Sequence, residues 1–380
     1  MKAFFRFIII ILCIFNISCK QEKSEKINTN VITIDLKDKN KKEYLFYDFD
    51  YIKLETTEEC LISSINKIIN CNDTIIIHSI KSNNIFEFSN TGTFIKKYSI
   101  GNGPNDIIYP VDIAYNKDNN TLWILDNYRI LKEFNRDGKL KSQTQVKDPY
   151  MRIATLDSNL FLFDANIGKA NDFLFNFINK NKSHKHIKKN EVFREIVYLP
   201  NSTFNIINDS IIYFHHQFED LIYCYHTIDE KVDTLYNIEY KSYQSISSIK
   251  EKVSISPLDY QKKYDNKDYI FGLRNLYCNE DKLFFTSEKD KINYCVFKND
   301  NKELIMSENL IKGLPNPRNI YGFDGRYIYY IVNVEDLKIH INELNILLKQ
   351  EQIPSKIKDL ISNIKEDDNP IIIKIDMYSM

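Results

Sequence analysis

The sequence predicts an all-β protein, a six-bladed β-propeller with a two-helix insertion near the C-terminus in the last blade. Three observations predict it: a composition rich in aromatic and β-branched residues, a recurring four-strand pattern, and two amphipathic segments near the end of the chain. Tyr and Phe number 25 and 24, whereas Gly and Pro number only 9 each. Aromatic side chains fit the pleated, half-buried surface of a sheet, so strands are expected to dominate.

The repeating unit is clearest in its first copy. An apolar stretch at 65–70, a β run at Thr74–His78, an alternating segment at Ile85–Phe88 and a last run at 94–100 are separated by polar turns. Four short strands of this kind are the content of one propeller blade. Copies recur at intervals of ~40–50 residues, in the range of propeller blades. The later copies begin at Val111, Arg152, Thr203, Leu273 and Asn319.

Two segments interrupt the repeat. Residues 241–268, between the fourth and fifth copies, are expected to form a loop or short helix over one face. Residues 335–350 and 355–365 place Leu and Ile at helical spacing, which predicts two amphipathic helices. They are expected to form an insertion at about 335–365 inside the sixth blade, which Ile371–Asp376 then completes.

A propeller must close its ring, commonly by pairing a strand from one terminus with the other. Val31–Leu36 and Tyr51–Leu54 are the two candidates for that closing strand. The propeller is therefore expected to span residues 31–380. An open β-sandwich with a helical tail is the alternative architecture, because regular turn spacing alone would also allow it.

The first eighteen residues predict an export signal. Lys2 and Arg6 precede an apolar run of nine residues at Phe7–Phe15, and a serine stands directly before Cys19. A positive start, a short apolar run and a small residue at the cleavage point are typical of a secretory signal peptide. A membrane-spanning helix would need about 20 apolar residues. The expectation is that residues 1–18 are a lipoprotein signal peptide and that Cys19 is the lipidated residue.

Residues 19–30 are expected to form a flexible tether, because the stretch after Cys19 is polar and lacks apolar anchors. Acyl chains add about 0.8 kcal/mol per buried methylene, so a lipidated Cys19 would hold the protein at a membrane without a spanning helix. The expected location is the cell envelope, as an outer membrane lipoprotein on the periplasmic or surface face. The alternative is an ordinary secretory signal with incidental cysteines at Cys13 and Cys19.

Four short motifs carry a resemblance to a known family. They are Tyr51–Thr57 before the first blade, Asn90–Ile95 at its end, the Gly-x-Gly-Pro loop Gly101–Asp106 with its acidic last residue, and Asp368–Pro370 before the final strand. With these motifs the chain resembles the six-bladed β-propeller lipoproteins of Bacteroidetes, which are related in architecture to NHL-type propellers. The resemblance is clearest in the first two blades. It implies a fold and an envelope address but no activity, because the family is largely uncharacterised.

Charge and cysteine content narrow the range of partners. Removing Lys2 and Arg6 with the signal leaves 49 basic against 52 acidic residues, a net charge of −3. Nucleic-acid binding calls for a clustered basic face, so no nucleic-acid partner is expected. The remaining cysteines lack the C-x-x-C spacing of metal or redox sites and are expected to be buried thiols, with one disulfide (Cys60–Cys71 or Cys278–Cys295) as the alternative. They are Cys60, Cys71, Cys224, Cys278 and Cys295.

Few residues suggest chemistry. The loop at 101–104 is expected to be a turn between blades with its glycines at positive φ, because a strand follows it and a phosphate-binding loop opens a helix. NHL-type lyases place several histidines, one per blade, around a metal in the central channel. His78 and His215, both in second strands, are the candidates for such a set, but no third or fourth histidine lies at a matching position. The neighbours His215 and His216 would point to opposite faces of a strand. Neither a metal site nor a cofactor is expected.

The remaining candidates are scattered. The carboxylates show no spacing that assigns acid and base roles, so they are expected to be solvated loop charges. They are Asp126, Asp164, Glu219 and Asp220. Trp123 and the many tyrosines would suit a sugar-binding face, although packing inside the blades explains most of them.

Three functional hypotheses remain, and no catalytic residue is assigned. The first is a binding or scaffolding module that holds a glycan, peptide or protein partner near the central channel. The second is a hydrolase or lyase with its active site at the channel mouth, which would need several carboxylates or histidines converging on one pocket. The third is a structural envelope component without a small ligand. The first is favoured because no catalytic motif is recognised.

Overall fold

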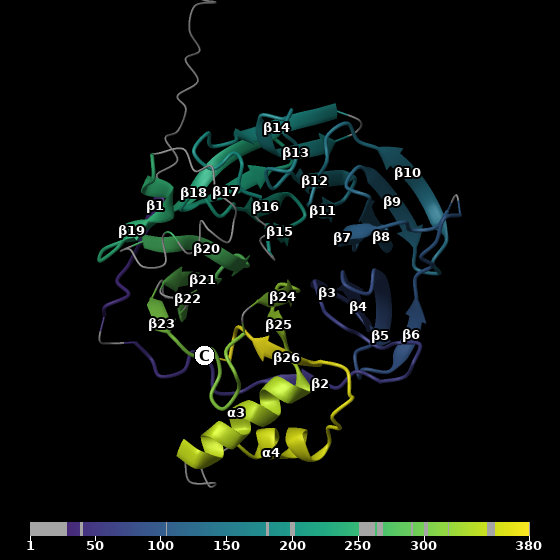
Figure 1. Cartoon of the computed structure of the whole chain (residues 1–380). Helices are drawn as coiled ribbons and strands as arrows, with labels where there is room; N and C mark the ends of the chain where they lie inside the picture. The colour runs from purple at the N-terminus through teal and green to yellow at the C-terminus, as the bar shows by residue number, and fades with distance from the viewer. Residues whose placement is uncertain are drawn as a thin grey trace, which may run out of the picture.

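The computed structural model describes residues 29–379, apart from residues 39–40, 104, 180–181, 198–201, 251–262, 264–268, 290–291, 300–302, 318 and 348–353. Within this part, six sheets of four or five strands stand in a ring around a central axis (Figure 1). The predicted six-bladed β-propeller is confirmed, and the alternative of a sandwich with a helical tail is wrong. Cys19 and the rest of the predicted signal peptide lie outside the described residues.

Each blade runs from an inner strand beside the axis to an outer strand at the rim, and consecutive strands are antiparallel. Blade one contains β3 (Lys67–Cys71), β4 (Thr74–Ser79), β5 (Asn84–Ser89) and β6 (Phe94–Lys97). Blade two contains β7 (Pro110–Asn116), β8 (Thr121–Asp126), β9 (Ile130–Asn135) and β10 (Leu140–Gln145). Blade three contains β11 (Arg152–Leu156), β12 (Asn159–Phe163), β13 (Phe173–Asn179) and β14 (Lys182–Lys188).

The other three blades repeat this arrangement. Blade four contains β15 (Phe204–Asn208), β16 (Ile211–Phe214), β17 (Leu221–His226) and β18 (Lys231–Tyr240). Blade five contains β20 (Tyr269–Cys278), β21 (Leu283–Lys289), β22 (Ile292–Lys298) and β23 (Leu304–Ser307). Blade six contains β24 (Ile320–Phe323), β25 (Tyr327–Val332), β26 (Ile371–Asp376) and β2 (Asp50–Ile52).

The ring is closed by a strand from the N-terminal part of the chain. β2 pairs antiparallel with β26, with Tyr51 opposite Ile373, so blade six combines segments from both ends of the sequence. The second candidate strand does something else: β1 (Asn30–Ile34) pairs in parallel with β18 and adds a fifth strand to the rim of blade four. The prediction of Tyr51–Leu54 as the closing segment is therefore confirmed, and Val31–Leu36 is wrong in that role.

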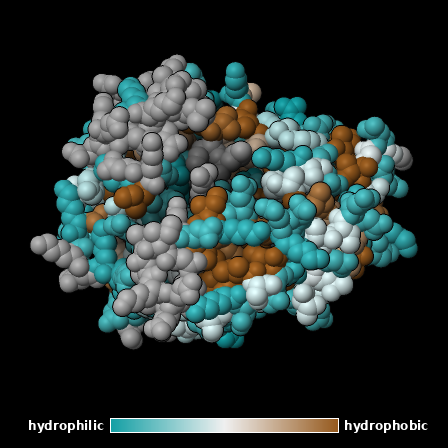
Figure 2. All heavy atoms as spheres, turned by 60° about the horizontal axis from the view of Figure 1, so that its bottom comes forward, coloured by the Kyte–Doolittle hydropathy of each residue, from teal (hydrophilic) through white to brown (hydrophobic). Residues whose placement is uncertain are grey.

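The predicted helical insertion lies between β25 and β26. It consists of α3 (Val334–Leu347) and α4 (Ser355–Ser362), which Figure 1 shows outside blade six. Leu337, Ile357 and Leu360 are fully buried in the same apolar cluster as the residues of β26. Seen from the side of this insertion, Figure 2 shows a mostly hydrophilic surface on which apolar side chains gather in a few places. No helix in the described part of the chain is long and apolar enough to cross a membrane.

The core consists of apolar layers between adjacent blades. Between blades three and four it is built largely of aromatic rings: the Phe175 ring meets that of Phe214 with centroids 4.7 Å apart, and Phe177 meets Tyr225 at 4.6 Å. A four-stranded sheet of this size has two apolar faces, and each must be covered by a neighbour to be buried. The five described cysteines are buried free thiols, as predicted, and the alternative of a disulfide is wrong.

The two faces of the ring differ in their connections. Turns between first and second strands, and between third and fourth strands, lie on one face, which we call the hairpin face. The opposite face, here the connection face, carries the links between blades and between second and third strands, including the helical insertion. The predicted loop at 241–268 is one of these links. In its described part it forms the short strand β19 (Gln244–Ser245) and one turn of 3-10 helix, η1 (Ile246–Ser248).

The side chain of Asn369 ties the closing segment to the last strand. Buried in front of β26, it donates to the carbonyls of Glu55 and Cys60 at 2.7 and 2.9 Å. Its side-chain oxygen accepts the N–H of Ile62 at 2.8 Å. The Asp-Asn-Pro motif singled out in the sequence therefore supplies the polar contacts that hold the ring closed.

We predict that Asn369→Ala lowers the free energy of unfolding by about 3 kcal/mol, because two carbonyls and one N–H would be left buried without partners. Asn363→Ala is the matched control, since the exposed Asn363 side chain bonds only within the end of α4. Urea denaturation followed by circular dichroism measures both changes. Equal, small losses in the two variants would show that Asn369 does not secure the closure.

Candidate functional site

A cavity of about 370 Å³ lies on the axis of the ring, between the inner strands of the blades. β3, β7, β11, β15, β20 and β24 all contribute to its wall. These strands are the inner edges of their sheets, so part of their backbone N–H and C=O groups lacks a partner within the blade. The wall of the cavity is therefore polar along its backbone, and side chains from neighbouring blades supply some of the missing partners.

Lys67 links the inner strands of three blades. Its ammonium group lies 3.0 Å from the Asp112 carboxylate and donates to the carbonyls of Ile113 and Ile153 at 2.6 and 3.3 Å. Asp112, which is fully buried, also accepts the N–H of Ile153 at 2.9 Å. Burial lowers the pKa of Lys67, although Asp112 opposes that shift. The lysine is thus an internal link that joins β3, β7 and β11.

Amide and hydroxyl groups link the other side of the ring. Ser202 and Asn205 both donate to the carbonyl of Leu276, at 2.8 and 3.0 Å, and so join blade four to blade five. The hydroxyl of Tyr277 donates to the carbonyl of Ile320 in blade six at 2.9 Å. From blade one, Asn70 donates to the Asp324 carboxylate of blade six at 2.7 Å. These contacts fix the width of the cavity.

The inner strands of blades six and one approach especially closely. A Cβ atom added at Gly322 would lie 2.3 Å from the carbonyl oxygen of Ile68. Only glycine fits at this crossing without displacing backbone, which is a common use of glycine where two chains meet.

The cavity changes character along the axis. At the hairpin face its lining is exposed and charged, with Lys117, Asp118 and Asp209 at the mouth. The apolar side chain of Ile206 in β15 is 42% exposed there, so a ligand in the mouth would contact it. At the other end the lining is buried, and Arg152 is only 4% exposed. The mouth therefore opens on the hairpin face, and Arg152 gives the inner end a buried cation.

A short strand also pairs with the start of blade five near the connection face. β19 pairs in parallel with the first residues of β20, on the edge of β20 that faces away from β21. The following residue Ile246 is fully buried beside Phe193, Phe218 and Phe271. This apolar cluster belongs to the connection face, in agreement with an opening at the hairpin face.

Three of the four carboxylates expected to be solvated loop charges are buried, so that interpretation is wrong for Asp126, Asp164 and Asp220, whereas the Glu219 side chain is partly exposed. Asp126 and Asp164 are fully buried and Asp220 is 8% exposed. Asp126 accepts the N–H groups of Ile108 and Tyr109 and pairs with Lys132 at 2.8 Å. They are buried because each satisfies backbone or side-chain donors on the connection face, a pairing that spacing in the sequence does not reveal.

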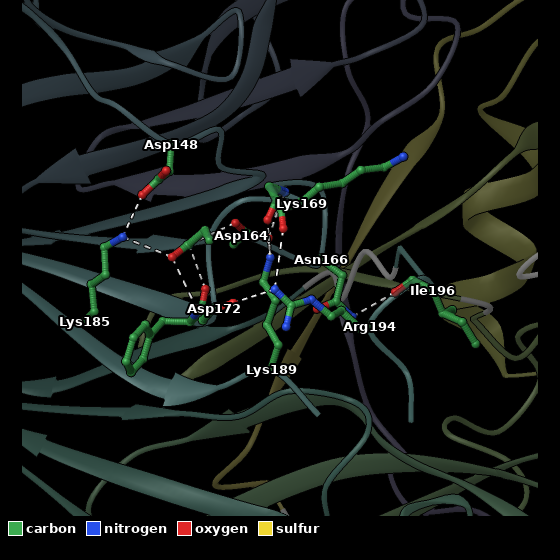
Figure 3. Close-up of polar contacts among 12 residues, drawn as sticks. Asp148, Asp164, Asn166, Lys169, Asp172, Lys185, Lys189, Arg194 and Ile196 are labelled. Carbon is green, nitrogen blue, oxygen red and sulfur yellow. Dashed lines mark hydrogen bonds and ion pairs between the residues drawn. The ribbon is translucent and has the colours of Figure 1, made fainter. Parts of the chain in front are cut away.

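Asp164 and Lys189 form a buried ion pair in blade three. Their atoms Oδ1 and Nζ are 2.7 Å apart, and both side chains are at most 1% exposed. Figure 3 shows this pair within a network that also holds Asn166 and Arg194. Burial raises the pKa of Asp164, while Lys189 and Asn171 oppose that shift. The pair lies on the connection face, far along the blade from the mouth of the cavity.

Glu219 and Asp220 contact different partners. Glu219 lies 3.0 Å from Nε2 of His216 and accepts the hydroxyl of Tyr223, whereas Asp220 accepts the hydroxyl of Ser247. No carboxylate pair with divided acid and base roles arises from them. Trp123, on β8, is half-buried against the aromatic layer between blades two and three.

The structure does not bring the candidate histidines together. His78 is in blade one, whereas His215 directly follows β16 in blade four. The ring of His78 lies between two blades: Nε2 is 3.0 Å from the carbonyl of Pro110, and Nδ1 is 3.2 Å from the Asn66 amide. In the described part of the chain, no three His, Cys, Asp or Glu side chains are grouped as metal ligands.

The conformation of the glycine-rich loop differs from the prediction. Gly101 and Gly103 do not have positive φ, contrary to the prediction. A Cβ at either position would instead meet the Asp106 carboxylate, at 2.4 and 2.8 Å. Asp106 accepts the N–H of Gly103 at 2.9 Å and so closes the turn. The glycines are required by the close approach of this carboxylate, and the loop links blades as predicted.

Sequence reasoning did not predict which residues line the central cavity. A usable signal exists: most first strands carry polar residues in otherwise apolar runs, which is unusual for a buried strand. Lys67, Asp112, Arg152, Asn205 and Asn275 are such residues. An alignment of the first strands of the six blades would have shown that these polar residues recur there. Such residues would then be expected to face the axis or the next blade.

Comparison with known proteins places the chain in a family. The family model for a domain of unknown function, DUF4934, matches residues 27–376. The chain belongs to the DUF4934 family. Among curated proteins, none matches it. The DUF4934 fold is similar to that of a predicted exported protein of Bacteroides fragilis, with a TM-score of 0.72 at 15% identity, over 91% of this chain and 99% of the other.

A second similar structure is a member of the DUF4221 family from Bacteroides vulgatus. Its TM-score is 0.50 at 10% identity, over 87% of this chain and 97% of the other. At these identities the likeness concerns the fold alone. The DUF4934 match and these two structures agree with the expected family of propellers at the level of fold.

The buried His78 of this DUF4934 protein makes stability depend on pH. Burial lowers its pKa from 6.5 to about 4, with Asp112 opposing that shift. The unfolded chain binds the proton more readily, so the folded state loses stability as pH falls from 6.5 toward 4. One shifted group of this kind changes the free energy of unfolding by about 3 kcal/mol across that window.

We predict that His78→Gln removes this part of the acid sensitivity. Urea denaturation at pH 7.5 and pH 4.5 should show a loss of stability about 3 kcal/mol smaller in the variant than in the parent protein. The control is His184→Gln, at a partly exposed histidine on the outer strand β14. The same pH dependence in all three proteins would contradict the assignment.

Proposed function

We propose that this DUF4934 protein is a cell-envelope lipoprotein that binds a glycan, peptide or protein partner at the open end of its central cavity. The observation that carries the proposal is the cavity itself. Its volume of about 370 Å³ lies within the range of ligand pockets, roughly 300–1,000 Å³. It combines an exposed charged mouth, an apolar side chain in its wall and a buried cation at its inner end.

The polar groups of the cavity wall support binding in preference to the alternative of a hydrolase or lyase. Lys67 and Asp112 are engaged with each other and with backbone groups. Asp324 accepts from Asn70 and from the hydroxyl of Tyr329. Groups held in this way fix the shape of the wall, whereas a general acid or base must reach a reacting atom.

The mouth offers contacts suited to an elongated ligand. Ile206 and the half-exposed Tyr321 give apolar contact area, while Lys117, Asp118 and Asp209 supply charges of both signs around the rim. The partners that neighbouring blades do not supply for the inner-edge backbone would come from the ligand or from water. Glycans and extended peptides both carry donors and acceptors along their length, so both fit this lining.

The membrane anchor is part of the same proposal. Lipidation at Cys19 would leave residues 20–29 between the anchor and β1, a span of at most ~35 Å when fully extended. β1 lies on the outer edge of blade four. The anchor would therefore attach at the rim of the ring, and the mouth of the cavity would stay open to ligands.

We predict that Ile206→Arg blocks the mouth of the cavity. The probes are fluorescein-labelled chitohexaose, maltohexaose and a random hexapeptide pool, titrated by fluorescence anisotropy. At least one should bind the parent protein, and Ile206→Arg should weaken it at least tenfold, because the new cation fills the entrance. Ile228→Arg is the matched control: Ile228 is 81% exposed in the β17–β18 turn, on the same face but outside the cavity.

Two outcomes would count against the proposal. Failure of every probe to bind, or equal effects of the two arginine variants, would remove the cavity as the binding site. Mass spectrometry of the recovered probes gives a further check. Cleaved probe after incubation with the parent protein, but not with Ile206→Arg, would favour the hydrolase or lyase alternative.

A further inference from the structure

A second hollow lies on the connection face, between blades two and three. It is an open groove of about 570 Å³, and its described lining combines aromatic, aliphatic and basic side chains. The residues that matter here are Tyr128, Arg129, Pro149, Met151, Ile167 and Val197. Aromatic residues, Met and Arg are the types enriched in the cores of protein interfaces. The groove is separate from the central cavity, with which it shares no lining residue.

The backbone of Tyr128 is in an unusual conformation. Asn127 and Tyr128 are the two central residues of the turn Asp126–Arg129 between β8 and β9, with φ of 47° and 64°. Positive φ at both positions is the pattern of a type I′ turn, in which glycine is strongly preferred at the second position. Eleven non-glycine residues of the described chain have positive φ, and seven of them are Asn or Asp. Tyr128 is the aromatic one among the other four.

The turn itself does not need a tyrosine. Its hydrogen bonds use backbone atoms: Asn127 donates its N–H to the carbonyl of Tyr109 at 2.9 Å, and the carbonyl of Tyr128 accepts the N–H of Tyr150 at 2.8 Å. Glycine at 128 would keep both bonds without the strain of a side chain at positive φ. The tyrosine ring therefore has to be explained by what it contacts, and such strain is a recognised pointer to function.

The ring of Tyr128 forms one wall of the groove. Its centroid lies 5.9 Å from that of Tyr109, and the two ring planes are inclined by 34°. Tyr128 is half-buried, so part of the ring remains available at the surface. A tyrosine held by its backbone on a pinned turn loses little conformational entropy when a partner covers it.

The opposite wall is held by the network drawn in Figure 3. Asn166 donates to the carbonyls of Phe193 and Ile196 at 3.1 and 3.0 Å, and Figure 3 shows it pointing at Ile196. Ile167 and Val197 directly follow these residues in the chain, and both line the groove. Val197 is 40% exposed, an apolar side chain held at the surface by a rigid support. The buried pair of Asp164 and Lys189 anchors the same loop.

The surroundings of the groove carry a positive charge. Arg129, Lys147 and Lys169 are exposed, and none forms an ion pair with a described residue. Three neighbouring acids form ion pairs: Asp148 with Lys185 at 2.8 Å, and Asp172 and Glu191 with the shared Arg194. A partner with carboxylates would therefore complement this rim.

We infer that the groove is a docking site for a partner protein segment that inserts one large apolar side chain and carries acidic residues on either side of it. Tyr128, Met151, Ile167 and Val197 surround the inserted side chain. Arg129 and the neighbouring lysines face the flanking carboxylates. Buried aromatic and arginine anchors surrounded by a polar rim are the usual arrangement of an interaction hot spot.

The test uses acetylated, fluorescein-labelled peptides Asp-Glu-Xaa-Glu-Asp with Leu, Phe, Trp or Gly at Xaa, titrated by fluorescence anisotropy. The Leu, Phe or Trp peptide should bind at least tenfold more tightly than the Gly peptide, and raising NaCl from 50 to 500 mM should weaken binding. Tyr128→Gly should weaken binding at least tenfold without lowering Tm, since glycine relieves the turn. Tyr128→Phe should retain binding within threefold, because the ring remains.

Two matched controls complete the design. Glu230→Gly relieves another positive-φ residue, in a turn on the hairpin face, and should leave peptide binding unchanged. Arg129→Glu should weaken the acidic peptides at least tenfold while leaving Tm within 2 °C of the parent value. Ile206→Arg should not affect them, so failure of the groove and failure of the central cavity can be told apart.

Several results would overturn the inference. A fall in Tm of Tyr128→Gly with peptide binding intact would show that the ring serves packing alone. Absence of binding by all four peptides, or equal binding of the Gly peptide, would remove the docking site. Binding of neutral maltohexaose that depends on Tyr128, without peptide binding, would assign the groove to a sugar instead.

Discussion

The fold depends on burying both faces of every blade against its neighbours, and therefore on closing the ring. A four-stranded sheet alone cannot hide two apolar faces, so each blade is stable only between two others. The last interface requires a strand from the N-terminal part, and β2 supplies it by pairing with β26. The hydrogen bonds of Asn369 reinforce this closure. Without the closure, a complete apolar layer of blade six would be exposed to water.

Closing the ring creates the cavity as a geometric consequence. Six inner strands cannot all pair with one another across the axis, so their edges leave unsatisfied backbone groups around a hollow. Lys67 on one side and Asn205 on the other satisfy some of these groups and tie blades together at the same time. The backbone groups of the inner strands that no side chain satisfies, together with the exposed mouth, are the places where a ligand could form hydrogen bonds without disturbing the contacts between blades.

The sequence revealed repeating, short-range features far better than contacts across the ring. Strand alternation and turn residues located every blade, and helical spacing located α3 and α4, because these patterns are local. The role of β1 was open, since parallel pairing with β18 depends on a contact about 200 residues away. Asp126 and Asp164 were misjudged for the same reason: their lysine and backbone donors are adjacent only after folding.

The glycine loop and Tyr128 show where residue type alone misleads. Glycine suggested positive φ at Gly101 and Gly103, but these glycines are needed for the approach of Asp106. Conversely, nothing about a tyrosine suggests positive φ, yet Tyr128 has it. Strain of this kind costs about 1–3 kcal/mol and persists only when the surroundings fix it. Sequence rules that assume unstrained backbone fail at such positions, which is why the groove emerged only from the structure.

The two hollows open on opposite faces of a ring whose blades are packed together by apolar layers. Coupling between two sites requires an element with two alternative arrangements that both sites bias. The described inner strands are held in one arrangement by side-chain links between neighbouring blades, and the walls of the groove are pinned by Asn166 and the pair of Asp164 and Lys189. Occupancy of one site therefore has no evident route to alter the other. If both proposed sites are occupied, such an architecture would hold the ligand and the partner segment at a fixed separation.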